Sequence, residues 1–275
     1  MTVIVYGGDA VSLILLLLMM QGVAAVDAEP GGYTPAVSCG VLVHHAAEAG
    51  DVVQFGGYDW IVLDLDEGYA LVITQKVIRM RDFHDAPEDV TWETSEIRRY
   101  LNEEFFYGFG EQDRARIRET FVVNRDNPWF DTPGGEDTTC RIFLLSIEEA
   151  VRYFGDSGYL EYYASLFDAV WEQVSGRPDH DGSWRMWQSW YVAEQVANQH
   201  GIFWWGIWDE YRHNRYALDM YGEPAFWWLR SPGFIPSIAA TIGRNGGLGM
   251  NGGHVGLGRG NIGIRPAMWL NLEHE

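Results

Sequence analysis

The chain has 275 residues, of which 47% are hydrophobic and 15% aromatic, and this is enough apolar material for a buried core. Disorder of the whole chain is therefore not expected. The formal net charge of -20 argues against a nucleic-acid partner, because a phosphate-binding surface needs clustered Lys and Arg.

An apolar run at residues 11–20 (VSLILLLLMM) is followed by small residues, as in the core and cleavage region of a signal peptide. The usual basic start is missing, since the first ten residues contain Asp9 and no Lys or Arg. Two interpretations stay open. Residues 1–28 are either the leader of an exported or cell-surface protein or a buried N-terminal helix of a cytoplasmic one. The stretch that follows is rich in Gly and Pro, so we expect a linker at 29–48 and a single domain at 49–275.

Short runs rich in β-branched and aromatic residues begin the domain. Residues 51–55, 58–65 and 69–74 are such runs, and turn residues separate them. Alternation of this kind predicts an antiparallel meander.

The pattern then changes to helices and loops. Thr94 or Ser95 can cap a helix, and Ser146 with Glu149 fits a capping box. The predicted elements are a helix at 95–106, a helix at 111–120, a loop at 126–135, a strand at 141–145 and a helix at 146–154.

Tryptophan and tyrosine are dense between residues 160 and 208, and Trp184, Trp187 and Trp190 have helical spacing. We interpret the aromatic residues of this stretch, which include Trp205 and Trp208, as packing between helices and sheet. An exposed aromatic platform for sugar stacking is the alternative.

Residues 233–263 contain closely spaced glycines and no periodicity long enough for a helix. Short strands and loops are expected there, with ordered stretches at 239–242 and 254–257. Strongly apolar sequence on both sides should anchor this segment to the core and suit it to display a surface.

Two motifs frame the glycine-rich segment: WWLRSPG at residues 227–233 and GIRPAMWLNL at residues 263–272. Together with GGYDW at 56–60 and DNPW at 126–129, they resemble a bacterial domain of unknown function found in many gut and soil bacteria. The resemblance runs from about residue 50 to residue 272, with a looser stretch at 161–205 that looks like an insertion.

The C-terminal half of that family is similar to C-type-lectin-like domains of the formylglycine-generating-enzyme type. Variable proteins of diversity-generating retroelements use the same fold. The resemblance implies an α+β, C-type-lectin-like domain in which residues 234–261 form a diversified surface. The enzymes of that type use a cysteine pair near the C-terminus, whereas no cysteine follows Cys140 here, so neither their oxidase chemistry nor any cofactor is expected.

Apolar and polar side chains lie between the glycines rather than on a periodic face, so no core is obvious for them. We therefore expect them to be exposed and to contact a ligand. These residues are Phe234, Ile235, Ser237, Ile238, Thr241, Arg244, Asn245, Met250, Asn251, His254, Leu257, Arg259 and Asn261.

Structural roles are expected for the residues that bracket this segment. Trp227, Trp228 and Trp269 lie in apolar sequence and should be core. Arg230 and Arg265 can tie loop carbonyls or an internal carboxylate, so alanine at either position should lower the melting temperature.

Metal and zinc sites are not expected. His84, Asp85, Glu88 and Asp89 form one acidic cluster, and Asp179, His180 and Asp181 form another. Neither cluster matches an EF-hand or HExxH spacing, so both are interpreted as solvated loops. Cys39 and Cys140 lack CxxC spacing, and the sequence leaves open whether they pair.

The functional hypothesis is a non-enzymatic binding protein whose partner is a protein or a glycan. No GxSxG elbow or GxxxxGK loop occurs in the chain. Two alternatives remain: a carbohydrate-active enzyme that combines acidic loops with an aromatic platform, and a structural component of an envelope or virion.

Overall fold

An antiparallel meander opens the described part of the chain, as its pattern predicts. Tight turns join its strands, and the first turn uses Gly56 and Gly57 at positive φ. The strands are β1 (Val52–Phe55), β2 (Tyr58–Asp66) and β3 (Tyr69–Thr74), and the last strand of the chain, β12 (Ala267–Asn271), pairs antiparallel with β3. The resulting four-stranded sheet has the order β1-β2-β3-β12.

The computed structural model describes residues 47–173, 191, 194–195, 198, 205–256 and 260–272. Residues Ala46–Glu275 belong to one compact unit. The predicted leader at 1–28, nearly all of the predicted linker and most of the predicted insertion at 161–205 lie outside the described residues. The described part contains helices and antiparallel strands, so the fold is α+β, as expected.

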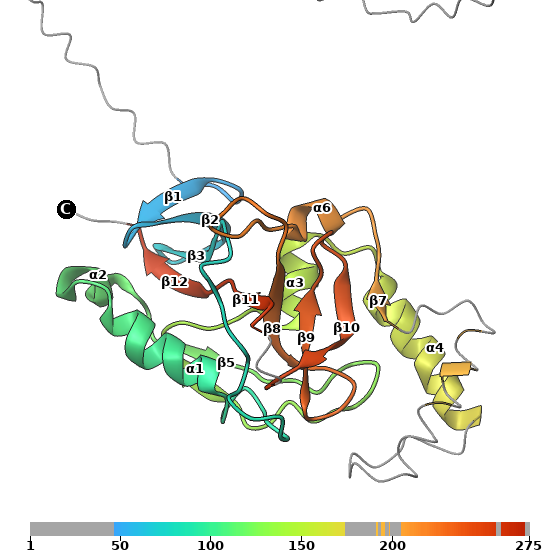
Figure 1. The fold of residues 1–275 in the computed structure, drawn as a ribbon. Helices are drawn as coiled ribbons and strands as arrows, with labels where there is room; N and C mark the ends of the chain where they lie inside the picture. Colours follow the sequence, from blue (N-terminus) through green and yellow to red (C-terminus); the bar gives the residue numbers. More distant parts are fainter. Residues whose placement is uncertain are drawn as a thin grey trace, which may run out of the picture. The chain divides into compact units, whose positions relative to one another are not determined.

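The glycine-rich segment forms strands of a second sheet, with the order β4-β11-β8-β9-β10-β7 (Figure 1). Its members are β4 (Arg79–Met80), β7 (Gly206–Ile207), β8 (Phe226–Pro232), β9 (Ile238–Ile242), β10 (Leu248–His254) and β11 (Ile262–Ile264). Strands were expected in this segment, and they are present. The ordered stretch predicted at 254–257 is wrong, because β10 already ends at His254. The central strand β8 is buried from Trp227 onward, which explains its continuous apolar sequence.

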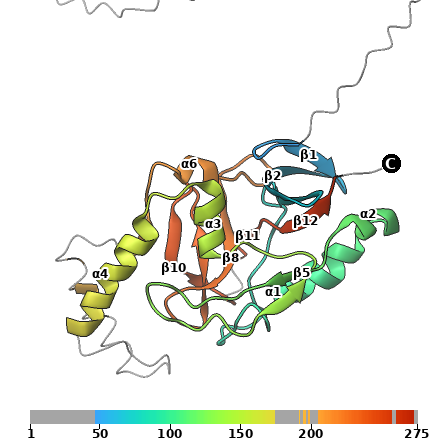
Figure 2. The same ribbon diagram turned by 180° about the vertical axis from the view of Figure 1, so that it is seen from behind.

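Helices flank the sheets (Figures 1 and 2). They are α1 (Glu96–Tyr100), which continues as the π-helix η1 (Leu101–Phe105), α2 (Glu111–Arg116), α3 (Ile147–Phe154), α4 (Tyr159–Gln173) and α6 (Arg212–Arg215). Ser95 caps α1, and the capping box of Ser146 and Glu149 is formed in full, as predicted. Within the described ranges, no helix has the length and apolar composition needed to cross a bilayer.

Two predicted elements differ from the structure. Helix α2 stops at Arg116 instead of residue 120, because Ile117 bridges to Leu270 and the chain then enters β5 (Thr120–Val122), the partner of β6 (Thr138–Cys140). The predicted strand at 141–145 is wrong.

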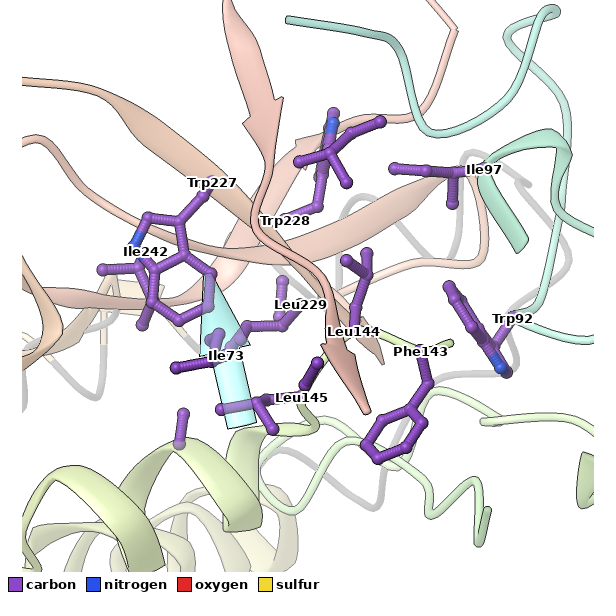
Figure 3. Packing of buried hydrophobic residues seen from close by; sticks show 14 of the residues in the cluster. Ile73, Trp92, Ile97, Phe143, Leu144, Leu145, Trp227, Trp228, Leu229 and Ile242 are labelled. Atoms are coloured by element: carbon purple, nitrogen blue, oxygen red, sulfur yellow. The ribbon is translucent and has the colours of Figure 1, made fainter. Parts of the chain in front are cut away.

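That segment is a buried connection. Phe143 makes one isolated bridge to Ala267, and the Leu145 carbonyl accepts a hydrogen bond from the Arg230 amide at 2.9 Å. Figure 3 shows Phe143, Leu144 and Leu145 among the packed side chains of the core. A run of apolar residues marks burial as well as a strand, and here burial alone accounts for it.

Both predicted clamp arginines are buried. Arg230 donates to the carboxylate of Glu149 at 2.8 Å, to the Leu144 carbonyl at 2.7 Å and to the Val123 carbonyl at 3.1 Å. These bonds tie β8 to the first turn of α3, to the segment before that helix and to the residue after β5.

Arg265 connects the two larger sheets. Its Nε donates to the Thr74 carbonyl at 2.7 Å, and its guanidinium lies over the rings of Trp227 and Phe154. Burial lowers the pKa of Arg265 to about 9. Trp227 and Trp228 are core residues as expected, whereas Trp269 is only half-buried, with Arg118 over its ring.

Candidate ligand-binding pocket

A tight turn joins β9 to β10 at residues 243–247. The amide of Gly243 donates to the Gly247 carbonyl at 2.8 Å, and the amide of Gly246 donates to the Gly243 carbonyl at 2.9 Å. The side-chain oxygen of Asn245 accepts from the Gly247 amide at 3.2 Å. The turn is therefore closed by its own hydrogen bonds, and it exposes Arg244 and Asn245.

A buried ion pair holds this turn in place. Arg215, at the end of α6, pairs with Asp209 and donates through Nε to the Gly246 carbonyl at 3.0 Å. Asp209 also accepts from the Ser157 hydroxyl at 2.9 Å, and the Arg215 carbonyl accepts from the Trp227 indole at 3.1 Å. The turn is thus tied to α6 and to the central strand β8.

Two exposed tryptophans flank the edge strand β7. This strand pairs antiparallel with β10, and the Trp205 carbonyl accepts from the Met250 amide at 3.1 Å. The side chains of Trp205 and Trp208 are 57% and 52% exposed. Backbone pairing therefore holds both indoles beside the turn while leaving much of their surface in water.

A pocket of about 570 Å³ lies between these tryptophans and the turn, within the size range typical of small-molecule sites. Its surface is mainly apolar. The lining residues are Trp205, Trp208, Pro224, Phe226, Thr241, Gly243, Arg244, Asn245, Gly247, Leu248, Gly249, Asn251 and Gly252. Figure 1 shows β7, β9 and β10, which carry or adjoin these residues, at one side of the six-stranded sheet.

Aromatic faces and a few polar groups meet in this pocket. The Arg244 guanidinium lies 5.5 Å from the centroid of the Phe226 ring. Thr241, Asn245 and Asn251 supply hydroxyl and amide groups. Apolar walls with a small number of polar groups are the usual composition of a ligand site.

Neighbouring glycines of the turn should differ sharply when changed to alanine. A Cβ on Gly246, whose φ is +79°, would collide with the Arg212 carbonyl, so G246A should destabilise the fold by more than about 1 kcal/mol. A Cβ on Gly247 would lie 3.3 Å from the Asn245 side-chain oxygen and 3.4 Å from the Trp208 indole. Small shifts of these exposed side chains relieve both contacts, so G247A should keep the melting temperature near wild type and narrow the pocket. Thermal melts of the two variants check this, and equal losses of stability would contradict it.

Four of the predicted contact residues line the pocket: Thr241, Arg244, Asn245 and Asn251. Four others are exposed or half-buried outside it, namely Phe234, Ser237, His254 and Asn261. Leu257 and Arg259 lie outside the described residues.

The predicted exposure is wrong for Ile235, Ile238 and Met250, which are buried, and Thr241 is also largely buried. Ile235, Ile238 and Met250 belong to the hydrophobic core. The loop at 126–135 bonds to the backbone of this segment, because the Asn127 side chain donates to the carbonyls of Pro232 and Met250, at 2.9 and 3.1 Å. Parts of the chain far away in the sequence therefore surround these residues, which local spacing did not reveal.

The sequence interpretation did not assign a binding role to the aromatic residues that line the pocket. Trp171 packs in the core as expected, but Trp205, Trp208 and Phe226 line the pocket. No local signal separated these residues from the core, because the charged residue after Trp208, Asp209, is itself buried.

The predicted acidic cluster lies elsewhere. His84 contacts the Glu88 carboxylate at 2.9 Å, and no group of three or more metal-ligating side chains occurs among the described residues. The second acidic cluster, at 179–181, is outside them.

A smaller cavity of about 290 Å³ is lined by Tyr58, Arg79, Tyr100 and Glu104, together with phenylalanine and glycine residues. Burial raises the pKa of Tyr58, and the neighbouring Tyr100 adds to the effect. Glu104 is the one carboxylate among the described residues that line it. Glycoside hydrolysis usually needs two carboxyl groups facing each other, so this cavity lacks the second one.

Comparison with known proteins gives a family. A family described as a domain of unknown function, DUF6273, matches residues 67–272. The chain belongs to the DUF6273 family. No curated protein and no solved structure matches it. The DUF6273 match includes both tryptophans, the turn and the anchoring ion pair of the pocket.

Proposed function

We propose that this DUF6273 protein is a non-catalytic binding protein that holds a saccharide in the pocket beside β7. The observation that carries the proposal is the pair of half-exposed indoles, Trp205 and Trp208, at the pocket wall. Apolar surface of this size is costly in water and commonly marks a recognition site. The flat face of an indole suits the C–H face of a sugar ring, and nearby amides suit its hydroxyl groups.

The composition of the pocket favours binding over catalysis. Among the described residues, no Asp, Glu, His or Cys belongs to its lining. General acid and base catalysis of glycosidic cleavage needs paired carboxyl groups. The same lining favours a glycan over a large flat protein surface, because a concave site encloses a small ligand.

Removing one indole should abolish most of the binding. After a glycan array has identified a ligand, W208A should bind it about 30-fold more weakly, a loss of about 2 kcal/mol, because hot-spot aromatic residues contribute on this scale. Isothermal titration calorimetry measures the loss.

The matched control is F121A, which removes an exposed aromatic side chain from β5, outside the pocket. We expect wild-type affinity from F121A and a wild-type melting temperature from both variants. Wild-type affinity in both W208A and W205A would place the site elsewhere.

We also propose that the domain has a C-type-lectin-like fold and that its turn surface is a diversified receptor-binding site. Support comes from the α+β composition, from the pairing of the last strand with the opening meander, and from the exposed Arg244 and Asn245 on the turn. Sequencing of this segment in many natural isolates tests the second part. Substitutions concentrated at exposed positions such as these would support it, and an invariant turn would contradict it.

A further inference from the structure

The charge of the pocket indicates which saccharides it selects. The whole chain has 39 acidic and 19 basic residues, yet among the described residues that line the pocket Arg244 is the one with a charged side chain. A cationic group in a pocket without carboxylates favours an anionic ligand over a cationic one.

Arg244 has its donors available. Among the described residues, its recorded contact is with the ring of Phe226, and no carboxylate or carbonyl accepts a hydrogen bond from it. The aromatic ring attracts the cation and holds it at the pocket wall without using the N–H groups. Five N–H donors therefore remain for a ligand.

Asn245, the next residue, adds a donor in the same place. Its side-chain oxygen accepts from the Gly247 amide, and this bond leaves the NH₂ end of the side chain free to donate. A ligand group at this side of the pocket should therefore be rich in acceptors.

We propose that the ligand is an acidic saccharide and that Arg244 binds the carboxylate of a hexuronate residue while the indole of Trp208 contacts a sugar face. This inference rests on the proposed saccharide binding and specifies its ligand class. A carboxylate is planar and accepts two parallel N–H bonds from a guanidinium, whereas a neutral hydroxyl group accepts without charge assistance. The carboxylate thus matches the free donors of Arg244 best.

The test uses oligomers of galacturonate, mannuronate and glucuronate, each paired with the same oligomer after its carboxyl groups have been reduced to alcohols. Each pair keeps its linkage and ring shape and differs in charge. Wild-type protein should bind at least one hexuronate oligomer about tenfold more tightly than its reduced partner, because charge-assisted bonds are about twice as strong as neutral ones.

Two variants separate the contributions. R244Q, which changes an exposed side chain, should remove the preference for the acidic oligomer, so that the ratio of the affinities for the acidic and the reduced oligomer falls to about one. W208A should weaken binding of both oligomers by the same factor.

Equal wild-type affinity for the acidic and reduced oligomers would overturn the inference and leave the proposed saccharide binding intact. Binding of neutral or sulfated glycans with no hexuronate bound would do the same. If R244Q still prefers hexuronates, Arg244 is not the residue that binds the carboxylate. Failure of the protein to bind any saccharide would overturn the proposed function itself.

Discussion

Replacement of Arg215 by alanine should lower the free energy of unfolding by about 3–5 kcal/mol, the range found when one member of a buried ion pair is removed. Arg215 and its partner Asp209 are both buried, so the variant leaves a carboxylate without its cation in the interior. The loss also includes the bond from Arg215 to the Gly246 carbonyl. Denaturant unfolding followed by tryptophan fluorescence measures it.

R212A is the matched control, because Arg212 lies on the same short helix and is exposed. Its unfolding free energy should stay within about 0.5 kcal/mol of wild type. R215A with the stability of R212A would contradict the role of the ion pair.

A milder change at the same position connects stability to binding. The lysine of R215K keeps a positive charge near Asp209. Its ammonium group lacks the planar, forked geometry by which the guanidinium bonds both the Asp209 carboxylate and the Gly246 carbonyl. The turn that carries Arg244 and Asn245 should then lose its anchor. We expect ligand affinity to fall in R215K under conditions where the protein stays folded, as seen by calorimetry below the melting temperature.

Replacement of Arg230 by alanine should cost about 2–4 kcal/mol, somewhat less than the range for a fully buried pair, because its partner Glu149 is 29% exposed. The variant also leaves the carbonyls of Leu144 and Val123 without this donor. For a domain of this size, we expect the melting temperature to fall by about 5–15 °C, measured by scanning calorimetry.

R152A provides the comparison on the surface. Arg152 is 71% exposed and lies 3.4 Å from the Asp64 carboxylate. Exposed pairs contribute about 0–1 kcal/mol, so R152A should melt close to wild type. Similar melting temperatures for R230A and R152A would show that burial adds nothing at Arg230.

Sequence patterns predicted the elements that depend on neighbouring residues. The meander follows from short β-branched runs and turns, and the start of α3 follows from the capping box of Ser146 and Glu149. Local sequence also predicted four residues of the candidate pocket. Arg244 and Asn245 lie in a glycine-rich turn, where exposure follows from the turn itself.

Partners far apart in the chain decided the rest. Residues 142–145 are apolar because the core surrounds them, and no ladder forms along them. Ile238 and Met250 are buried in the hydrophobic core, and the backbone of Met250 accepts a hydrogen bond from Asn127, which lies far away in the sequence. The spacing of apolar residues along a sequence indicates which residues share a face. It does not indicate what packs against that face.

The sequence by itself determined an α+β domain, the order of its first strands and helices, and a glycine-rich C-terminal segment made of strands and turns. Only the tertiary structure decided where the aromatic residues go. Trp171 enters the core, whereas Trp205 and Trp208 stand beside the turn at 243–247 because β7 pairs with β10. Burial depends on the sum of contacts from the whole chain, so identical side chains in one aromatic-rich stretch have different roles.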